Sequence, residues 1–404
     1  MNPTLVEFLK QPALPATKQQ AATAPAETDV PDVPYPATAP LTVLVLEGDY
    51  RLTGAVLFCL SRQAGVRVHL LSRDVRSPYR FSNYVRSFHL LAPEIPEEVF
   101  VAFVQNAARA TGAKVLLPVD VAGMRFAIAH RAALETAMRL LPLPAAAYYE
   151  IATDKGLLGA FMQEHRIPAP DTIVDIRHNL AAKLATFGFP VLLKPIEGAG
   201  GRGIVRYDTP EALLAAVAAL PDSSRYVVQN CIEGYDIDCN VLYQNGQLVA
   251  HSIQKGLVAT GDEYAPTEAI EFVHHDAVLA VVDRLMKDLR WNGVAHLDLR
   301  YDARARQIKV IEINTRFWLT VVGSALVAGV NFPVLACQVA AGQAVAPAPF
   351  REGRYIPFSN YLKYRYGRRV RRADDVRFSL RDTSIGAFLG DPFTKIYRFL
   401  TDED

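Results

Sequence analysis

Hydrophobic positions in the N-terminal third of the chain fall into short continuous runs separated by stretches with helical spacing. The continuous runs predict buried strands: LTVLVLEGD at 41–49, VRVHLL at 66–71 and AKVLLPVD at 113–120. The helical spacing predicts helices at 53–64, near 97–111 and at about 121–140. Alternating strands and helices are typical of a parallel sheet that carries helices on its faces.

Such a sheet binds ligands at the edge formed by the carboxyl ends of its strands. The turn after the first strand reads EGDYRLTG and lacks the GxGxxG pattern of dinucleotide-binding folds. Arg51, Asp74 and Asp120 follow predicted strands and are therefore expected near this edge. Two roles stay open for these three residues, contact with a ligand or capping of turns.

The middle of the chain begins with a helix capped by Thr153 or Asp154 and running to about His165. A strand, FPVLLKPI, is expected at 189–196. The elements expected after it are a short strand IVRYD, a helix at 209–220, and strands within 226–255, at 293–302 and at 307–317.

Composition narrows the class of protein. The 404 residues suffice for two or three domains. With 43 basic and 42 acidic residues the net charge is +1, so no nucleic-acid partner is expected. No apolar run approaches the roughly 18 residues of a membrane span. The four cysteines form no CxxC pair, which favours core thiols in a reducing, cytoplasmic compartment. The first 40 residues hold eight prolines and no glycine and are expected to be a mobile leader.

The segment VLLKPIEGAGGRGIV at 191–205 places a lysine and a glycine-rich loop between two strands. Glycine lets backbone N–H groups approach phosphate oxygens without a Cβ in the way, and Lys194 adds a point charge. The segment is not a P-loop, because no GKS or GKT opens a helix. Taken alone, the loop leaves two interpretations open, a phosphate-binding loop or a flexible hairpin with a solvated lysine.

Two later strands carry acidic residues that favour the phosphate-binding interpretation of the loop. Alternation places His296, Asp298 and Arg300 on one face of the first strand, and Glu312 and Asn314 on one face of the second. Two carboxylates and an amide oxygen form a hard-oxygen set that suits Mg²⁺. The alternative is a structural ion pair, for example of Glu312 with Arg300 or Arg316.

These motifs, taken together and in this order, resemble the ATP-grasp superfamily of ligases, in its carboxylate–amine ligase and carbamoyl-phosphate-synthetase-like branch. The resemblance covers residues 41 to about 345. It implies an α/β fold in which a Rossmann-like, parallel-sheet pre-ATP-grasp domain precedes a two-lobed ATP-grasp domain. The domains expected are a leader at 1–40, the N-terminal domain at 41–145, the ATP-grasp domain at 146–345 with lobes at 146–225 and 226–345, and a basic, aromatic extension at 346–404.

The resemblance also implies which residues bind ATP. TDKGLLGAF would place Lys155 at the α-phosphate, and VLLKPIEGAGGRG would place Lys194 and the loop over the phosphates. In VVQNCIEGYD, Gln229 would receive the adenine amine, where many members have glutamate, and Asp236 would hold the ribose. The full nucleotide set is Lys155, Lys194, Glu197, Gly198, Gly200, Gly201, Gly203, Gln229, Asn230, Ile232 and Asp236, with Asn230 and Ile232 meeting the ring edge through their backbone.

The remaining site residues belong to the reacting end. The resemblance implies that Lys255 contacts the γ-phosphate and that Arg316, within EINTRF, stabilises the transferred phosphoryl group. Its metal ligands correspond to Asp298, Glu312 and Asn314, with Mg²⁺ as the metal and Mn²⁺ as an alternative. Thr315 stands where many members have proline.

The family chemistry implied is a two-step ligation. A substrate carboxylate attacks the γ-phosphate to give an acyl phosphate and ADP, and an amine then displaces phosphate. The alternatives are a carboxylate kinase or carbamoyl-phosphate-type enzyme, and a catalytically inactive nucleotide-binding regulatory protein. His251, His274 and His275 are expected near the acceptor side, in a structural or a catalytic role. The partners expected are a small carboxylate and an amine, and a homodimer is expected by analogy.

The segment YLKYRYGRRVRRADDVRFSLR at 361–381 has eight basic and two acidic residues with aromatic residues between them. Two interpretations stay open. The segment packs its aromatic residues on the core and solvates its arginines, or it contacts an anionic partner such as a membrane surface at the periphery.

Overall fold

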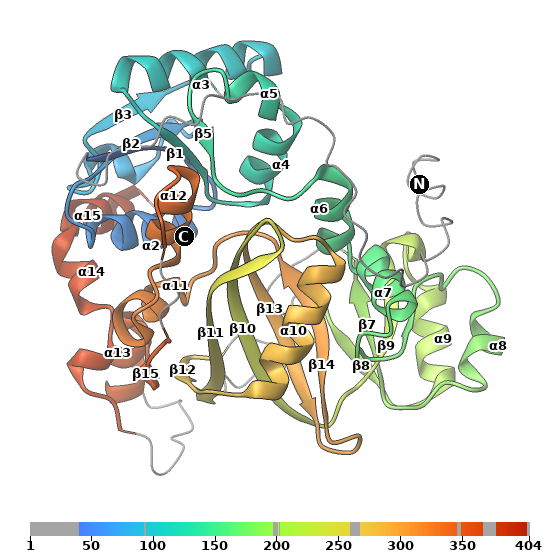
Figure 1. The fold of residues 1–404 in the computed structure, drawn as a ribbon. Helices are drawn as coiled ribbons and strands as arrows, with labels where there is room; N and C mark the ends of the chain where they lie inside the picture. The colour runs from blue at the N-terminus through green and yellow to red at the C-terminus, as the bar shows by residue number, and fades with distance from the viewer. Residues whose placement is uncertain are drawn as a thin grey trace, which may run out of the picture.

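The computed structural model describes residues 40–92, 94–196, 201, 203–258, 267–345, 349–366 and 377–401. Within them the chain forms three β-sheets with helices packed against them (Figure 1). One sheet is parallel and the other two are built from antiparallel pairs. The predicted α/β fold, with a parallel sheet ahead of a second α/β part, is confirmed.

The N-terminal sheet has five parallel strands in the order β3-β2-β1-β4-β5. Its strands are β1 (Leu41–Leu46), β2 (Val66–Ser72), β3 (Ser87–Leu90), β4 (Val115–Pro118) and β5 (Arg139–Leu140). Its helices are α2 (Tyr50–Ser61), α3 (Glu97–Thr111), α4 (Val121–Ala129) and α5 (Arg131–Leu134). The single helix predicted at about 121–140 was wrong, because His130 leaves the helical conformation and β5 pairs with the sheet edge.

The central sheet has six antiparallel strands in the order β14-β13-β10-β11-β12-β15. Its strands are β10 (Gly234–Gln244), β11 (Gln247–Val258), β12 (Ala269–Phe272), β13 (Gly293–Asp302), β14 (Gln307–Asn314) and β15 (Gly353–Tyr355). The helical segments that follow or cover it are α10 (Asp276–Asp288), α11 (Val321–Gly323), the π-helix η3 (Ser324–Ala328) and α12 (Phe332–Ala340). Strand β15 comes from the segment beyond residue 345, so this sheet crosses the boundary expected there.

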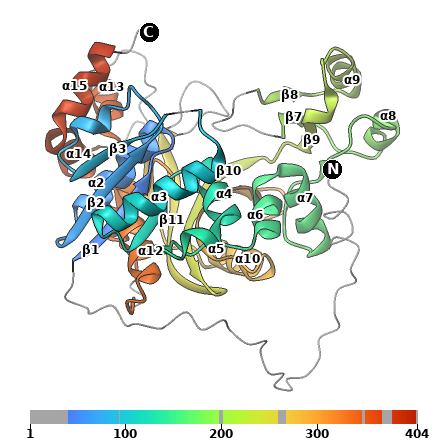
Figure 2. The same cartoon turned by 90° about the horizontal axis from the view of Figure 1, so that it is seen from above.

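The third sheet has four strands in the order β6-β9-β7-β8 and stands apart from the other two, together with helices α8 and α9 (Figure 2). Its elements are β6 (Thr172–Ile173), α8 (Leu180–Leu184), β7 (Val191–Pro195), β8 (Val205–Tyr207), α9 (Pro210–Ala218) and β9 (Tyr226–Asn230). Strand β9 pairs with β6 and β7. The four-stranded sheet therefore includes Tyr226–Asn230, which follows the lobe boundary proposed at residue 225.

The buried apolar residues form two main clusters. One runs continuously from the N-terminal sheet through the central sheet and includes Leu44, Tyr149, Phe272 and Trp291. The smaller cluster belongs to the four-stranded sheet and its two helices. The four-stranded sheet thus has a core of its own, while the other two sheets share one. We retain the division into an N-terminal domain and a two-lobed second domain as a proposal.

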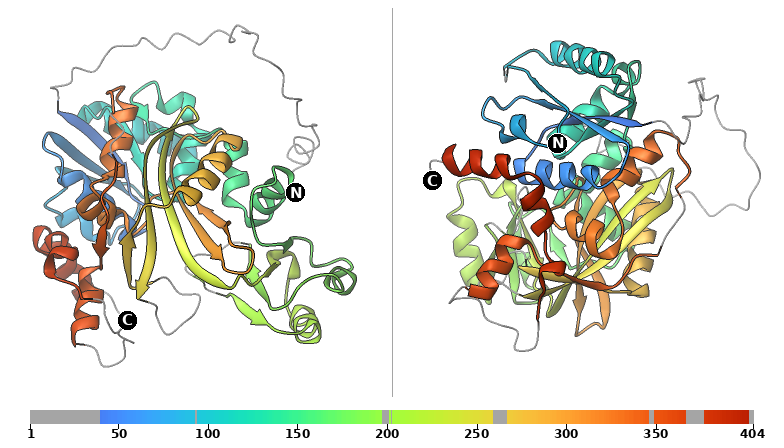
Figure 3. Two further views of the ribbon diagram at one scale, coloured as in Figure 1. Left: turned by 60° about the horizontal axis from the view of Figure 1, so that its bottom comes forward. Right: turned by 90° about the vertical axis from the view of Figure 1, so that its left-hand side faces the viewer.

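The C-terminal elements return to the N-terminal sheet. Helix α15 (Pro392–Thr401), preceded by α14 (Ile385–Gly390), packs against the 3-10 helix η1 (Pro78–Phe81) of the N-terminal part (Figure 3). Helix α13 (Phe358–Tyr366) packs instead at the central sheet, where Asn360 donates to the Glu268 carbonyl at 3.2 Å. Asp391 accepts hydrogen bonds from the Ser82 hydroxyl at 2.6 Å and the Asn83 N–H at 2.9 Å. Tyr364 packs edge-on against Phe378, which supports the packing interpretation for the aromatic residues of this segment.

No single helix among the described residues is long and apolar enough to cross a membrane. The pair formed by Val321–Ala328 and Phe332–Ala340, bent by 94°, meets the length and composition criteria only when taken together. Cys59, Cys239 and Cys337 are buried, Cys231 is partly exposed, and all four are free thiols.

Candidate active site

Two predicted acidic residues meet across neighbouring strands of the central sheet. In the antiparallel register of β13 and β14, Asp298 is opposite Glu312 and His296 is opposite Asn314. Residues opposite each other in an antiparallel pair point to the same face of the sheet. Burial and the nearby Asp298 charge raise the pKa of Glu312. The sheet therefore brings two carboxylates and one amide together, as the sequence predicts.

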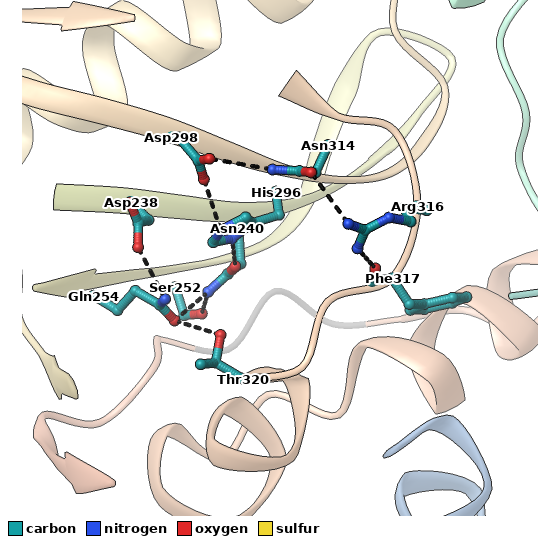
Figure 4. A network of polar contacts seen from close by, with 10 residues as sticks. All are labelled: Asp238, Asn240, Ser252, Gln254, His296, Asp298, Asn314, Arg316, Phe317 and Thr320. Atoms are coloured by element: carbon teal, nitrogen blue, oxygen red, sulfur yellow. Dashed lines mark hydrogen bonds and ion pairs between the residues drawn. The ribbon is translucent and has the colours of Figure 1, made fainter. Parts of the chain in front are cut away.

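A polar network extends from this cluster across the same face (Figure 4). Asn314 Nδ2 lies 3.3 Å from Asp298 Oδ2, and Arg316 Nη2 lies 3.4 Å from Asn314 Oδ1. Arg316 also donates to the Phe317 carbonyl at 2.7 Å. The guanidinium of Arg316 is thus fixed beside the predicted metal ligands, where it can face a transferred phosphoryl group.

On its other side, the cluster continues through His296. The His296 ring approaches Asp298 Oδ1 through Nε2 at 2.9 Å and Asn240 Oδ1 through Nδ1 at 2.6 Å. Burial alone would lower the pKa of His296, but the Asp298 carboxylate outweighs it and raises the pKa. Ligand atoms of Asp238, His296 and Asp298 all lie within 4.8 Å of one another.

Lys155 reaches the carboxylates from a separate helix. The expected helix is in fact two, α6 (Ala146–Thr153) and α7 (Lys155–Glu164), which break at Asp154. Asp154 caps α7 by accepting from two backbone N–H groups, as predicted. Lys155, the first residue of α7, then places Nζ 3.1 Å from Glu312 Oε2. The ion-pair partner of Glu312 is thus Lys155, not Arg300 or Arg316.

Thr315 helps to hold these elements together. Its hydroxyl lies 3.0 Å from that of Thr153, and its carbonyl accepts from the Tyr149 hydroxyl at 3.2 Å. The end of β14 is therefore tied to α6 immediately before Lys155. This gives a local reason for threonine at a position where the resemblance leads one to expect proline.

Lys194 comes from the four-stranded sheet and is buried there. Its Nζ donates to Gln229 Oε1 at 2.6 Å, and Gln229 Nε2 donates to Thr172 Oγ1 at 3.1 Å. Burial lowers the pKa of Lys194, with Glu312 acting in the opposite direction. Gln229 thus holds the lysine head with a neutral partner, and its amide oxygen is directed at Lys194.

The glycine-rich loop is described only in part. Gly201 and Gly203 adopt φ values of +76° and +77°, a conformation that L side chains rarely adopt. A Cβ on Gly203 would also lie 3.0 Å from the Pro195 ring. Glu197, Gly198 and Gly200 lie outside the described residues.

The predicted adenine hinge follows β9. The Asn230 N–H donates to the Asp171 carbonyl at 3.0 Å, and its side-chain amide donates to the Gly188 carbonyl at 2.5 Å. Ile232 is buried, and its carbonyl accepts from Arg300. Asp236 pairs with the same arginine at 2.6 Å. The hinge residues are therefore held by the backbone carbonyls of Asp171 and Gly188 and by Arg300, which the sequence did not assign to this site.

Lys255 does not join the cluster, which argues against its predicted role at the γ-phosphate. It is opposite Ile237 in the register of β10 and β11, whereas Asp238 and Gln254 form the next pair. Successive residues of a strand point to opposite faces, so Lys255 lies on the face away from Asp298. Its Nζ is 4.2 Å from the centre of the Tyr235 ring.

Sequence reasoning missed several polar residues on the metal-side face. Gln254 accepts from Thr320 Oγ1 at 3.0 Å and donates to Asp238 Oδ2 at 3.0 Å, while Asn240 donates to Ser252 and Gln254 at 3.0 and 3.2 Å. Burial raises the pKa of Asp238 to about 7. Strand alternation in the sequence could have identified them, because every second residue is polar in DIDCN at 236–240 and in SIQ at 252–254.

The edge of the parallel sheet holds capping groups. Asp120 caps α4 and also accepts from the Asp49 N–H at 3.1 Å, and Asp74 accepts from the Arg76 N–H at 2.8 Å. The capping interpretation of Asp74 and Asp120 is confirmed. For Arg51, the backbone N–H donates to the Asp49 cap.

The three histidines expected near an acceptor have structural contacts. His251 and His274 both pack against Phe350, with ring-centroid distances of 5.3 and 4.2 Å, and His275 caps α10. His251 is opposite Val241, on the face away from the carboxylates. This favours the structural role for these residues.

The donor set at β13 and β14 fits Mg²⁺. Two carboxylates directly opposite each other repel unless a cation or proton lies between them. Asp298 and Glu312 supply hard oxygens and Asn314 an amide oxygen, and the four-stranded sheet brings Lys194 to the same region. These residues could hold Mg²⁺ together with the phosphates of a nucleotide.

The fold and this geometry define an α/β protein whose polar cluster lies between two lobes. Residues 152–320 match the family model of the ATP-grasp domain. The predicted resemblance is thereby confirmed for residues 152–320, which match an ATP-grasp domain.

A curated relative and two solved structures show the range of similar proteins. The arginine-specific large chain of carbamoyl phosphate synthase from Geobacillus stearothermophilus is 22% identical over 220 residues, which cover 53% of this chain and 21% of that protein. The biotin carboxylase domain dimer of Hydrogenobacter thermophilus 2-oxoglutarate carboxylase, in complex with MgADP, ADP and bicarbonate, matches with a TM-score of 0.60 and 18% identity, covering 78% of this chain and 73% of that one. L-amino acid ligase from Bacillus licheniformis matches with a TM-score of 0.58 and 17% identity, covering 78% and 79%.

These similarities are partial in covered length and low in sequence identity. The chain spans less than half the length of the curated relatives it matches. The structural matches are below 25% identity and establish the fold, not the reaction.

Proposed function

We propose that the protein is a Mg-ATP-dependent ligase that activates a carboxylate as an acyl phosphate and joins it to an amine, with release of ADP and phosphate. The observation that carries this proposal is the convergence of groups from separate elements. Asp298, Glu312 and Asn314 come from two strands, Lys155 from the start of α7, and Arg316 from the segment after β14. A structural ion pair of Glu312 with Lys155 would need neither Lys194 from the other lobe nor Arg316 nearby.

The proposed roles follow the positions of the charges. Lys155 and Lys194 are cations that can neutralise phosphate oxygens, and Arg316 is placed to neutralise charge on the group in transfer. Phosphoryl transfer needs positioning and charge neutralisation more than covalent help from the protein. When bound, Mg²⁺ would be held by Asp298, Glu312 and Asn314 and would supply further positive charge at the terminal phosphates.

The nucleotide is proposed to lie along β13. Asp298 and Arg300 are two residues apart on the same face, about 7 Å along the strand. The phosphate end would lie at Asp298 and the ribose end at Asp236, which pairs with Arg300. Gly201 and Gly203, with the rest of the loop, would cover the phosphates and exclude water, which protects an acyl phosphate from hydrolysis.

A carbamoyl-phosphate-type reaction is the second candidate. It is favoured by the similarity to carbamoyl phosphate synthase, although that match covers only part of the relative. The two candidates differ in what they consume, because a carbamoyl-phosphate-type enzyme requires bicarbonate, whereas a carboxylate–amine ligase requires an organic acid and an amine together.

The test is release of ADP and phosphate from Mg-ATP across a crossed panel of small carboxylic acids, bicarbonate and amines. Release that depends on both an acid and an amine supports the ligase. Release with an acid alone points to a carboxylate kinase, and release that depends on bicarbonate points to the second candidate. If no combination gives release and Mg-ATP causes no thermal shift, the enzymatic proposal is wrong.

We also propose a cytoplasmic location and a homodimer. The free, mostly buried thiols support a reducing compartment, and the dimeric biotin carboxylase domain supports the second suggestion by analogy of fold. Nucleotide affinity would be measured with Mn²⁺ as well as Mg²⁺, since both suit carboxylate and amide oxygens.

A further inference from the structure

Arg300 makes three hydrogen bonds to a single short segment of the chain. Nε donates to the Ile232 carbonyl at 2.7 Å, Nη1 to Asp236 Oδ1 at 2.6 Å, and Nη2 to the Gly234 carbonyl at 3.2 Å. The planar guanidinium presents its N–H groups in a fixed fork, so the three acceptors are held in one arrangement.

The same segment is held close to β13 by its backbone. Ala303 N–H donates to the Glu233 carbonyl at 2.9 Å. Gly234 adopts a φ of +155°, and a Cβ there would lie 1.8 Å from the Tyr301 carbonyl oxygen. Glycine is therefore required where the segment crosses the strand, and Arg300 fixes the residues on either side.

These residues are the ones that the proposed function assigns to the nucleotide. Ile232 belongs to the hinge at the base, and Asp236 is the proposed ribose ligand. Asp236 and Arg300 lie directly opposite each other on β10 and β13, on the same face as Asp298. An arginine with a structural role alone could lie on either face of the sheet. Arg300 lies on the face of the proposed metal ligand Asp298 and connects β13 to the hinge.

We propose that Arg300 is a nucleotide-positioning residue that sets the selectivity of the site for ribose. This inference rests on the proposed function, because it assumes that a nucleotide binds at the hinge. Arg300 holds the Asp236 carboxylate through one oxygen and leaves the other to accept a hydrogen bond from a ribose hydroxyl. It also fixes the Ile232 backbone, so base and ribose contacts are aligned before the nucleotide arrives.

The test is calorimetric titration of the full-length protein with Mg-ADP and with Mg-2′-deoxy-ADP. The variants are Arg300→Met, Arg300→Lys and Asp236→Asn, with Arg304→Met as the control, because Arg304 is exposed on the adjacent β13–β14 turn. Wild type is expected to prefer ADP. Arg300→Met should bind ADP about 10-fold or more weakly and lose most of that preference, and Asp236→Asn should lose the preference too. Arg304→Met should match wild type.

Arg300→Lys keeps the charge but loses the fork, so it should fold and show an intermediate preference. If wild type binds ADP and both Arg300 variants keep its affinity and its preference for ribose, the inference is wrong. A loss of thermal stability in these variants without a change in ribose preference would mean that Arg300 is structural only, which also overturns it. If wild type binds no nucleotide at all, the proposed function fails first, and that result is distinct from failure of the Arg300 assignment.

Discussion

Asp298 and Glu312 lie directly opposite each other on β13 and β14, on one face of the central sheet. Burial raises the pKa of Glu312, and the negative charge of Asp298 raises it further. The two carboxylates are therefore stabilised when a cation or a proton reduces their combined negative charge. Lys155 supplies one such cation at 3.1 Å. This relationship makes Glu312 the most direct residue on which to test the site.

Replacing Glu312 by alanine should abolish ADP formation while the protein stays folded. The change removes one of two carboxylates that the proposal gives to Mg²⁺, and loss of one such charged group typically costs about 100-fold or more in turnover. ADP release is measured with the acid and amine that support wild-type turnover, and folding by circular dichroism.

The matched control for this change is Glu271→Ala, because Glu271 is a glutamate of the same sheet that pairs with Arg354 on neighbouring β15. It should retain near wild-type turnover. Substantial turnover in Glu312→Ala would remove Glu312 from the metal site.

Lys194 and Lys255 should differ sharply when each is replaced by methionine. Lys194 is buried, its Nζ donates to Gln229, and Glu312 favours its charged form, so Lys194→Met removes a cation and a hydrogen bond from the proposed phosphate site. At 100 times its dissociation constant, Mg-ATP should stabilise wild type by roughly 2.7 kcal/mol, and this shift should disappear in Lys194→Met. Lys255 lies over Tyr235 on the other face, so Lys255→Met should keep the full shift. If Lys255→Met lost the Mg-ATP-induced stabilisation as fully as Lys194→Met, Lys255 would belong to the nucleotide site.

At Lys255 the family pattern and the strand geometry disagree. The resemblance places a basic residue after SIQ, but alternation along β11 gives the metal-side face to Ser252 and Gln254. Strand periodicity alone would therefore have placed Lys255 on the opposite face from Asp298. The hairpin of β13 and β14 was predictable from two short strands joined by a polar turn, but the pairing of Asp298 with Glu312 was not. It depends on a register shift between Asp298 and Leu299, without which Asp298 would lie opposite Ile311.

Other features depend on contacts between distant parts of the chain and carry no local signal. Strands β5 and β6 have only two residues each and exist because they pair with β4 and β9. The Lys155–Glu312 ion pair and the contact of Thr153 with Thr315 both require α6 and α7 to pack on the end of β14. The sequence predicts each of these elements but not their juxtaposition.

Glu47 should make the stability of the protein depend on pH. Its Oε1 accepts from the Ser77 hydroxyl at 2.7 Å, and burial raises its pKa above the ordinary range. A carboxyl group with a raised folded-state pKa contributes stability below its unfolded-state pKa and loses it as pH rises through the folded-state value. The free energy of unfolding of Glu47→Gln, relative to wild type, should therefore increase between about pH 4 and pH 8.

This comparison uses urea denaturation at both pH values. The control is Glu98→Gln, because Glu98 is exposed in the first turn of α3. Its difference from wild type should stay nearly constant. A difference for Glu47→Gln that is constant or falls with pH would show that the Glu47 pKa is not raised.

The basic C-terminal segment predicts weak binding to anionic membranes. Lys363, Arg365, Arg377 and Arg381 are exposed, while Tyr361, Tyr364 and Phe378 pack around a small cluster that includes Ile356. The aromatic residues are thus used in packing and the charges remain available. Each basic side chain near an anionic surface contributes about 1 kcal/mol, so the interaction should be lost at high salt.

Sedimentation with phosphatidylserine-containing and neutral vesicles measures this binding. Wild type should sediment only with the anionic vesicles and only at low salt. Replacing the four basic residues by glutamine should reduce binding by about 10-fold or more, since the change removes several kcal/mol of attraction. Arg304→Gln with Arg306→Gln, on the exposed β13–β14 turn, should change it little because these arginines lie in a different segment. No sedimentation of wild type at low salt would leave aromatic packing as the role of this segment.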